Sequence, residues 1–342
     1  MIAAAPGTAV PDPEPAPPGG PVSSLAELLG RQAADAMALS GARSSAWNGT
    51  VSWLPREGRA VPRSVVGIAD WDGTIYYDRN YVERPLETLF ATGGGELEWY
   101  ELHRAKNALA VILHENCHLL ASDPEDHTLT KARWSWPLVV LEEGATELFT
   151  QAKLNAYVAR LGLDRLAPTL KEVESDATYP LFVPAVQTLT QGVGRLAGQP
   201  GSEVLRKVIC EAGARKFQTL GAIVLQSSGL ASRMPASHHE AAQEVIADAV
   251  RNAFGDVARI GPFLTPETSL KVSRRVGREA LRGILLELEK LDAHYPNVVH
   301  GAMEVGARRR PILPPGIAAT HAGHRRAPLD AGAARAEAGL TR

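Results

Sequence analysis

One stretch of this chain constrains its fold more than any other: residues 101–121, which read ELHRAKNALAVILHENCHLLA. The stretch contains neither proline nor glycine, and apolar residues crowd its second half, which predicts an interior α-helix. Within it stands the pattern H-E-x-x-H, from His114 to His118. Residues four apart share one face of a helix, so the two histidines can hold one metal ion between them. Glu115 is rotated away from that face, where its carboxylate can reach a metal-bound water without becoming a ligand.

The apolar sequence on both sides of the motif predicts that its polar side chains are buried. ALAVIL runs directly into His114, and LLA follows His118. Buried imidazole and carboxylate groups are costly unless they are paired, and a metal ion would satisfy all three. We therefore expect zinc as the cofactor and hydrolysis of an amide bond as the chemistry. The alternative is a helix with two surface histidines and an incidental glutamate, which the apolar flanks disfavour.

A second helix is predicted over residues 136–161, WPLVVLEEGATELFTQAKLNAYVARL, after a loop at 122–135. Ser135 can serve as its N-cap, and Pro137 fits in its first turn. The apolar residues repeat with helical spacing. A helix here would follow the metal helix closely enough in sequence to supply a third ligand.

Three glutamates are the only acidic residues of this second helix. Glu143 and Glu147 are four apart and share a face, whereas Glu142 is expected to point elsewhere. Gly144 costs a helix about 1 kcal/mol relative to alanine, so its presence indicates a close helix–helix approach. Glu143 beside it is therefore the better ligand, and Glu147 could accept a hydrogen bond from a ligating histidine. The alternative is a solvated acidic face, which the flanking PLVVL and ELF disfavour.

Together, H-E-x-x-H at 114–118 and E-G-A-x-E at 143–147 resemble the active site of the gluzincin metallopeptidases. That superfamily includes thermolysin-like enzymes and the M1 aminopeptidases. Its third ligand is a glutamate on a downstream helix, often directly before glycine, and a further acidic residue orients the first histidine. The resemblance implies three zinc ligands, a general base and a residue that supports a ligand: His114, His118 and Glu143; Glu115; and Glu147.

The resemblance covers roughly residues 65–160 and is not complete. Glu142 occupies the place of the family's usual asparagine, and the connection between the two helices is longer than in the best-known members. No G-x-M-x-N-type signature supports the aminopeptidase branch. A looser similarity exists to the ImmA/IrrE-type proteases. We therefore predict a zinc-dependent metallopeptidase acting on a peptide or protein, and keep open a narrow-specificity regulatory or toxin-type protease and a zincin-fold binding module with a structural zinc.

Upstream of the metal helix the chain reads as β structure. The runs at 64–69 and 74–77 are rich in β-branched and aromatic residues, and Asp-Trp-Asp-Gly separates them, which predicts a hairpin. A further strand is expected at 50–54. In zincins the edge strand of a small sheet pairs with an extended substrate, so either run of the hairpin is a candidate substrate-binding edge. A purely structural hairpin is the alternative.

Downstream, the chain is predicted to be mostly helical, with apolar spacing of three and four near 166–176, 181–197, 202–227, 238–255 and 266–292. The expected fold class is α+β: a zincin-like metal lobe, with a small sheet and two helices, followed by a helical lobe. The transition state needs a donor for the oxyanion. The sequence does not choose among its candidates, Tyr157, Tyr179, His238 and His239.

Four regions follow from these patterns. Residues 1–23 are proline-rich and almost uncharged and are expected to be disordered. Residues 24–176 form the expected metal-binding lobe and 177–304 the helical lobe. Residues 305–342 are expected to be a flexible tail.

Composition narrows the class of protein. A net charge of −2 gives no general case for nucleic-acid binding. No apolar run approaches the length that spans a membrane, and the beginning of the chain does not resemble a signal peptide. Two cysteines do not make a disulfide framework, and Cys117 inside the motif is expected to be buried packing. These features predict a cytoplasmic protein, with specialised export left open and no expectation for its oligomeric state.

Overall fold

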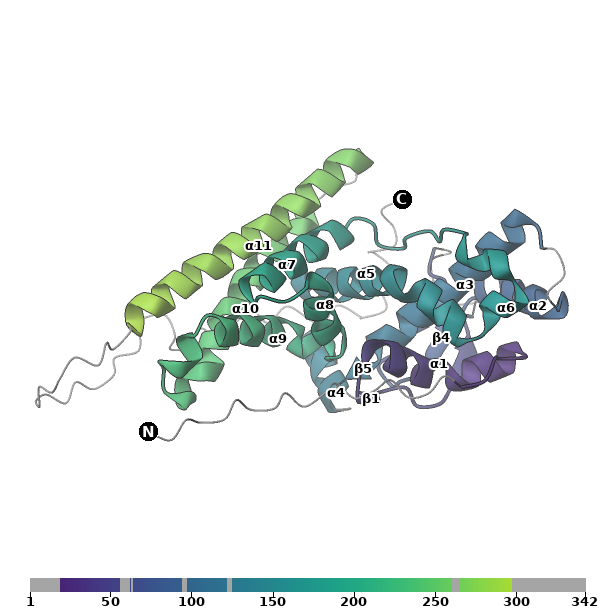
Figure 1. Cartoon of the computed structure of the whole chain (residues 1–342), viewed down its shortest axis with the longest axis horizontal. Helices are drawn as coiled ribbons and strands as arrows, with labels where there is room; N and C mark the ends of the chain where they lie inside the picture. The colour runs from purple at the N-terminus through teal and green to yellow at the C-terminus, as the bar shows by residue number, and fades with distance from the viewer. Residues whose placement is uncertain are drawn as a thin grey trace, which may run out of the picture.

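The computed structural model describes residues 19–55, 62, 64–93, 97–121, 125–259 and 265–296. Over these residues the chain has a mixed α+β fold that is mostly helical and carries a small sheet (Figure 1). None of the helices in the described ranges combines the length and the apolar character needed to cross a membrane. The strands are β1 (Ser44–Ser45), β2 (Val51–Trp53), β3 (Gly67–Ala69), β4 (Ile75–Tyr77) and β5 (Leu120–Ala121). The α-helices are α1 (Leu25–Ser40), α2 (Arg84–Ala91), α3 (Trp99–His118), α4 (Glu125–Ala132), α5 (Trp136–Arg160), α6 (Leu163–Leu166), α7 (Val183–Leu196), α8 (Gly201–Ile209), α9 (Gly213–Ser227), α10 (His239–Gly255) and α11 (Pro266–His294).

The three-stranded sheet has the order β2-β4-β3, with β2 parallel and β3 antiparallel to β4, and β1 and β5 pair antiparallel in a separate two-stranded sheet. Gly73 ends the turn between β3 and β4: its N–H donates to the Asp70 carbonyl at 3.0 Å, and its φ of 84° suits glycine. The predicted hairpin and the additional strand are confirmed. Because β4 is paired on both sides, it cannot accept a further strand. Of the two candidate substrate edges, the one at 74–77 is therefore wrong, whereas the other, β3, lies at an edge of the sheet.

Helices α3 and α5 confirm the two predicted helices and run antiparallel to each other. At the start of α3, the Glu98 N–H donates to the Glu101 side chain at 3.2 Å, which satisfies one of the free donors of the first turn. Along the pair, His114 on α3 faces Glu147 on α5, while Lys106 faces Asn155. This opposite order of contacts defines the antiparallel direction. It also brings the H-E-x-x-H turn of α3 beside the three glutamates of α5.

The glycine of α5 marks a close approach, as predicted, and the neighbour is the start of α7. A Cβ at Gly144 would lie 2.7 Å from Val186 Cγ2 and 3.1 Å from Phe182 Cβ. Such contacts leave no room for a side chain, so the cost of glycine in the helix is offset by packing. Helix α5 contacts α3 on one side and α7, α8, α9 and α10 on others, and it runs through the middle of the molecule (Figure 1).

The helices after α5 differ from the prediction in two places. No long helix forms over 166–176: α6 is a single turn, and a 3₁₀ turn at Pro168–Lys171 follows, because Pro168 cannot continue the preceding helix. The expected helix at 202–227 is broken into α8 and α9. The break allows Gly213 to begin α9 in tight contact with α4 and α5, where a Cβ would lie 2.8 Å from Thr130 Cγ2.

Several elements were not predicted from the sequence. The stretch expected to be a loop at 122–135 contains α4, so that expectation is wrong. Helices α1 and α2 and a π-helical turn at Arg79–Glu83 also lie in segments for which no helix was predicted. Ser24 caps the start of α1, and its hydroxyl accepts from the Glu27 N–H at 3.2 Å. Its position is fixed by Asp35, which accepts from Arg160 on α5 at 2.7 Å.

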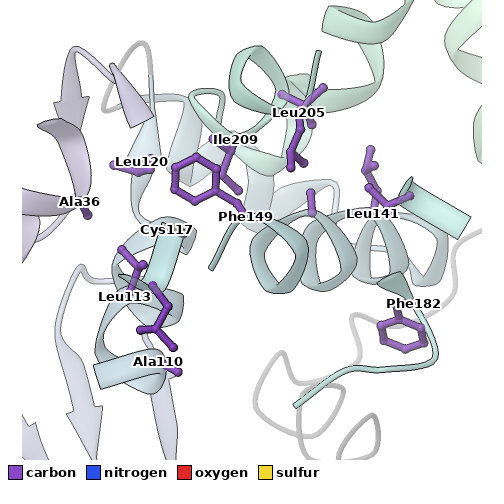
Figure 2. Close-up of a cluster of buried hydrophobic side chains, with 14 of the residues drawn as sticks. Ala36, Ala110, Leu113, Cys117, Leu120, Leu141, Phe149, Phe182, Leu205 and Ile209 are labelled. Carbon is purple, nitrogen blue, oxygen red and sulfur yellow. The ribbon is translucent and has the colours of Figure 1, made fainter. Parts of the chain in front are cut away.

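A hydrophobic core cluster contains buried side chains from both the predicted metal-binding lobe, residues 24–176, and the predicted helical lobe, residues 177–304. Cys117 belongs to it and is fully buried, as expected for packing. Residues 1–18 and 297–342 lie outside the described residues, whereas Val22 is buried and its N–H donates to the Leu161 carbonyl at 2.9 Å. Figure 2 shows side chains from α3, α5 and α8 in this core, among them Leu113, Cys117, Leu141, Phe149, Leu205 and Ile209.

Candidate metal centre

The two histidines of the motif lie on the buried face of α3. His114 and His118 are each 5 % exposed, and their rings lie 4.8 Å apart between centroids. They occupy successive turns, so both present one ring nitrogen toward α5. The burial predicted from the apolar flanks is therefore correct.

Glu143 on α5 completes a set of three donor atoms. Its Oε2 lies 3.2 Å from His114 Nε2 and 3.3 Å from His118 Nε2, and the ligand atoms of the group all lie within 4.8 Å of one another. Donor atoms bound tetrahedrally at about 2.0–2.1 Å from zinc lie about 3.3–3.4 Å apart. Glu143 Oε1 is buried and has no hydrogen-bond partner among the described residues. Two imidazoles and a carboxylate with this spacing fit a zinc ion.

The other ring nitrogens also face carboxylates. His114 Nδ1 lies 3.3 Å from Glu147 Oε2, and His118 Nδ1 lies 3.0 Å from Glu142 Oε1. The second contact is a hydrogen bond, of the kind that fixes the orientation and tautomer of a ligating imidazole, whereas the first is an ion-pair contact. The expectation that Glu142 points away from the site is wrong: Glu142 is buried and stands to His118 as Glu147 stands to His114. Gln151 holds Glu147 by donating to its Oε1 at 2.9 Å.

The site carries an excess of buried negative charge. Lys216 of α9 is a buried lysine beside the site, with Nζ 3.1 Å from Glu142 Oε2. Four carboxylates against one ammonium favour further positive charge, which a proton on His114 or a bound metal ion would supply, because isolated buried charges are costly. The four carboxylates belong to Glu115, Glu142, Glu143 and Glu147.

These contacts shift the pKa values of the groups. Burial by itself lowers the pKa of His114, but the carboxylates of Glu143 and Glu147 outweigh it and raise the pKa to about 10. Burial by itself raises the pKa of Glu143, but the two histidines hold it well below its usual value. Burial likewise opposes ionisation of Glu142, and Lys216 and His118 lower its pKa. Glu142 and Glu143 are therefore held in the ionised form, which suits a cation.

Glu115 of α3 also lines the cavity, and its side chain contacts strand β3. Its Oε2 accepts from the Ala69 N–H at 2.8 Å. A Cβ at Gly67 would lie 2.7 Å from Glu115 Cγ and Oε1, so the strand passes directly over this side chain. The roles of Gly67 and Ala69 were not predicted from the sequence, because a glycine in a short strand indicates a close approach but does not identify the neighbour.

The cavity between β3, α3 and α5 has a volume of about 40 Å³. A water molecule needs roughly 10–15 Å³ of such space, so the cavity holds a few waters and not a stretch of peptide. Tyr179 stacks on His114, with ring centroids 5.6 Å apart at 23°. The lining consists of Ser64, Val65, Val66, Gly67, Val111, His114, Glu115, His118, Glu143, Thr178 and Tyr179.

Residues 173–182, here called the roof segment, pass beside the cavity and line it with Thr178 and Tyr179. Asn107 of α3 accepts from the Asp176 N–H at 2.9 Å and donates to Asp176 Oδ2 at 3.0 Å. Ser175 donates to Gln151 Oε1 on α5 at 2.8 Å. These partly exposed hydrogen bonds, and the stacking of Tyr179, hold the segment in place. Val173 and Phe182 anchor its two ends in the core, at 3 % and 7 % exposed, so only the part between them is held by weak contacts.

Of the four candidate oxyanion donors, only Tyr179 lines the cavity. His238 Nδ1 lies 2.7 Å from the Tyr295 hydroxyl, and His239 Nε2 lies 2.9 Å from the Ala231 carbonyl, so both are engaged with the C-terminal helices. Tyr157 is fully buried in the core. Lys216 was missed, although its spacing of four and eight from Leu220 and Val224 places it on the apolar face of α9, which marks a buried lysine in need of an acid.

Comparisons with known proteins identify no relative of this chain. No protein-family model, no curated protein and no solved structure matches the chain.

Proposed function

We propose that this protein is a zinc-dependent metallopeptidase, with His114, His118 and Glu143 as zinc ligands and Glu115 as general base. The observation that carries the proposal is the position of Glu143 Oε2, 3.2 and 3.3 Å from the two histidine Nε2 atoms. This spacing matches ligands around a tetrahedral zinc. Glu143 Oε1, which has no hydrogen-bond partner in the described part of the chain, and the excess of buried carboxylates support the same conclusion.

The residues of the cavity divide the chemistry of amide hydrolysis among them. Zinc bound by the three ligands would lower the pKa of a coordinated water and polarise the substrate carbonyl. Glu115 takes a proton from the water that attacks the substrate carbonyl and gives that proton to the leaving amine. The Ala69 N–H fixes Glu115 Oε2 at 2.8 Å, so the base is held in one orientation before substrate arrives. Tyr179 supplies a hydroxyl for the developing oxyanion, since it is the candidate donor that lines the cavity.

Strand β3 is the proposed docking edge for an extended substrate. It is an edge strand of the sheet, and the chain leading into it, residues 64–67, lines the cavity. A peptide added to a sheet edge gains main-chain hydrogen bonds and places its carbonyls at regular intervals. Because the cavity holds only a few waters, a peptide enters after the roof segment moves aside. Endopeptidase action on a flexible chain is therefore the form of the activity that we propose.

The decisive experiment measures zinc content and peptide cleavage together. The purified protein is expected to bind about one zinc per chain and to cleave members of a mixed peptide library at neutral pH. His118→Ala should remove the zinc, and Glu115→Gln should keep the zinc and the fold and lose nearly all cleavage. Cleavage by Glu115→Gln at the wild-type rate would overturn the role of Glu115. A wild-type protein without zinc would overturn the whole proposal.

A second function, a binding module with a structural zinc, is favoured by one observation: the small volume of the cavity beside the roof segment. Structural zinc sites are closed, whereas catalytic sites keep an open position. This alternative predicts bound zinc without cleavage of any peptide. A narrow-specificity protease predicts an intermediate outcome, in which a peptide library resists cleavage and a single protein in a proteome digest is cut.

A further inference from the structure

Lys216 is a buried lysine that the proposed chemistry does not use. It lies in the first turn of α9, is 1 % exposed and places its Nζ 3.1 Å from Glu142 Oε2. Lysine is almost never fully buried unless it is paired, because its ammonium loses its hydration. The position of Lys216 next to one particular carboxylate therefore needs a reason.

Glu142 connects Lys216 to a proposed zinc ligand. Its Oε2 faces Lys216, while its Oε1 lies 3.0 Å from His118 Nδ1. On the far side of the same ring, His118 Nε2 lies 3.3 Å from Glu143 Oε2. An unbroken series of contacts thus runs from the ammonium through the Glu142 carboxylate and the imidazole to the metal ligands.

The start of α9 is built around this carboxylate. A Cβ at Gly213 would lie 2.9 Å from Glu142 Oε2, so any side chain there would displace the carboxylate or the helix. The Ala214 N–H donates to Thr130 Oγ1 of α4 at 2.9 Å, which anchors the same turn. The backbone that carries Lys216 is therefore fixed relative to α5.

We propose that Lys216 is a positioning residue of the metal centre: its ammonium holds the Glu142 carboxylate, and the carboxylate holds the His118 ring with Nε2 toward the metal. The inference rests on the proposed function, because it requires that His118 binds zinc. It also accounts for a glutamate at the place where the gluzincin pattern has asparagine. A charged side chain is stable in this buried position because a cation from the C-terminal helices accompanies it.

The test compares zinc affinity in Lys216→Met, Glu142→Gln and the double variant, measured by competition with a chelator. The visible absorption of bound Co²⁺ reports the geometry of the ligands in the same proteins. Lys106→Met is the matched control: Lys106 is also buried, at 2 % exposure, but bonds to Asn155 and the Leu170 carbonyl instead of the site. It should leave zinc affinity and the Co²⁺ spectrum unchanged.

Lys216→Met is expected to weaken zinc binding about tenfold, at the lower end of the usual effect of residues that support metal ligands, and to alter the Co²⁺ spectrum. The double variant is expected to bind zinc no more weakly than Glu142→Gln, because both changes interrupt the same series of contacts. If Lys216→Met does not fold, the double variant decides, because it leaves neither a buried ammonium nor a buried carboxylate unpaired at this position; zinc affinity equal to that of Glu142→Gln is then the expected result.

Two results would overturn the inference while leaving the proposed function intact. One is wild-type zinc affinity and an unchanged Co²⁺ spectrum in Lys216→Met. The other is a double variant weaker than Glu142→Gln by the full factor that Lys216→Met shows alone, since independent effects add. Absence of zinc from the wild-type protein would instead overturn the proposed function, and this inference with it.

Discussion

Gly67 lies directly against Glu115: a Cβ at this glycine would be 2.7 Å from both Cγ and Oε1 of the glutamate. Two residues further along the strand, the Ala69 N–H donates to Glu115 Oε2 at 2.8 Å. The position of the proposed base is thus set by the backbone of β3. This contact is possible only because residue 67 has no side chain.

Gly67→Ala is expected to displace Glu115 and slow peptide cleavage about tenfold or more, since small misplacements of catalytic groups are costly. Zinc content should not change, because Glu115 is not a proposed ligand. The measurements are kcat on a cleaved peptide and metal content of the purified variant. Gly30→Ala is the control, since no atom lies within 4 Å of the added Cβ. Wild-type kcat in Gly67→Ala would show that β3 does not position the base.

Tyr179→Phe tests the proposed oxyanion donor. The phenyl ring keeps the stacking on His114 and loses only the hydroxyl, so kcat is expected to fall about a hundredfold with zinc binding and KM little changed. Tyr157→Phe removes a buried hydroxyl that has no hydrogen-bond partner among the described residues and lies away from the cavity lining. It should cleave at the wild-type rate. Equal activity of both variants would assign the donor to another group.

The parts of the site that lie within one helix could be predicted from the sequence. The spacing of His114 and His118 and the apolar residues around them are local properties, and they predicted a buried pair on one face. The hairpin was equally local, because Asp-Gly between β-branched runs specifies a turn. Glu143 and Glu147 required only the assumption that the second helix packs against the first.

The residues that could not be predicted depend on how distant segments pack. Helical spacing from Glu143 placed Glu142 off the shared face, yet it reaches His118 because α9 closes that side with Lys216. The sequence marks Lys216 as a lysine on an apolar face without naming its partner. In the same way, the glycine at position 67 indicates a close approach but does not identify Glu115 as the neighbour. Side-chain partners across separate elements need the tertiary structure.

Asn107→Ala is expected to loosen the roof segment, because it removes both hydrogen bonds between α3 and Asp176. If displacement of the segment limits substrate entry, kcat/KM should rise roughly fivefold, the lower end of what two such bonds contribute. Gln218→Ala is the control, since it removes a comparable side-chain hydrogen bond, to Glu244, on the C-terminal helices. A fall in kcat/KM in Asn107→Ala would indicate that the closed segment is the active form.

Lys106 makes the stability of the fold depend on pH. Burial, with a smaller effect of Lys171, lowers its pKa from 10.5 to about 8. Between these values the unfolded chain keeps a proton that the folded protein has released, so the free energy of unfolding rises with pH across this window. Below pH 8 the full cost of burying the ammonium remains. The free energy of unfolding in denaturant is measured for zinc-free wild type and for Lys106→Met. The value for wild type should rise relative to that of Lys106→Met from about pH 8 to 10.5. A difference that does not change with pH would contradict this prediction.

Shortening the chain tests whether the C-terminal helices belong to the metal centre. Residues 1–18 and 305–342 lack a periodic apolar pattern, so a protein of residues 19–305 is expected to bind zinc and to melt within a few degrees of the full chain. A chain ending at Asp176 would lose α7, which packs against Gly144, and α9, which supplies Lys216. It would expose the apolar face of α5 and leave Glu142 without its cation, so it should lose cooperative unfolding and zinc binding together. Thermal unfolding with and without zinc distinguishes the outcomes. A soluble, folded and zinc-binding piece of this length would show that the first 176 residues form an independent domain and that Lys216 is dispensable.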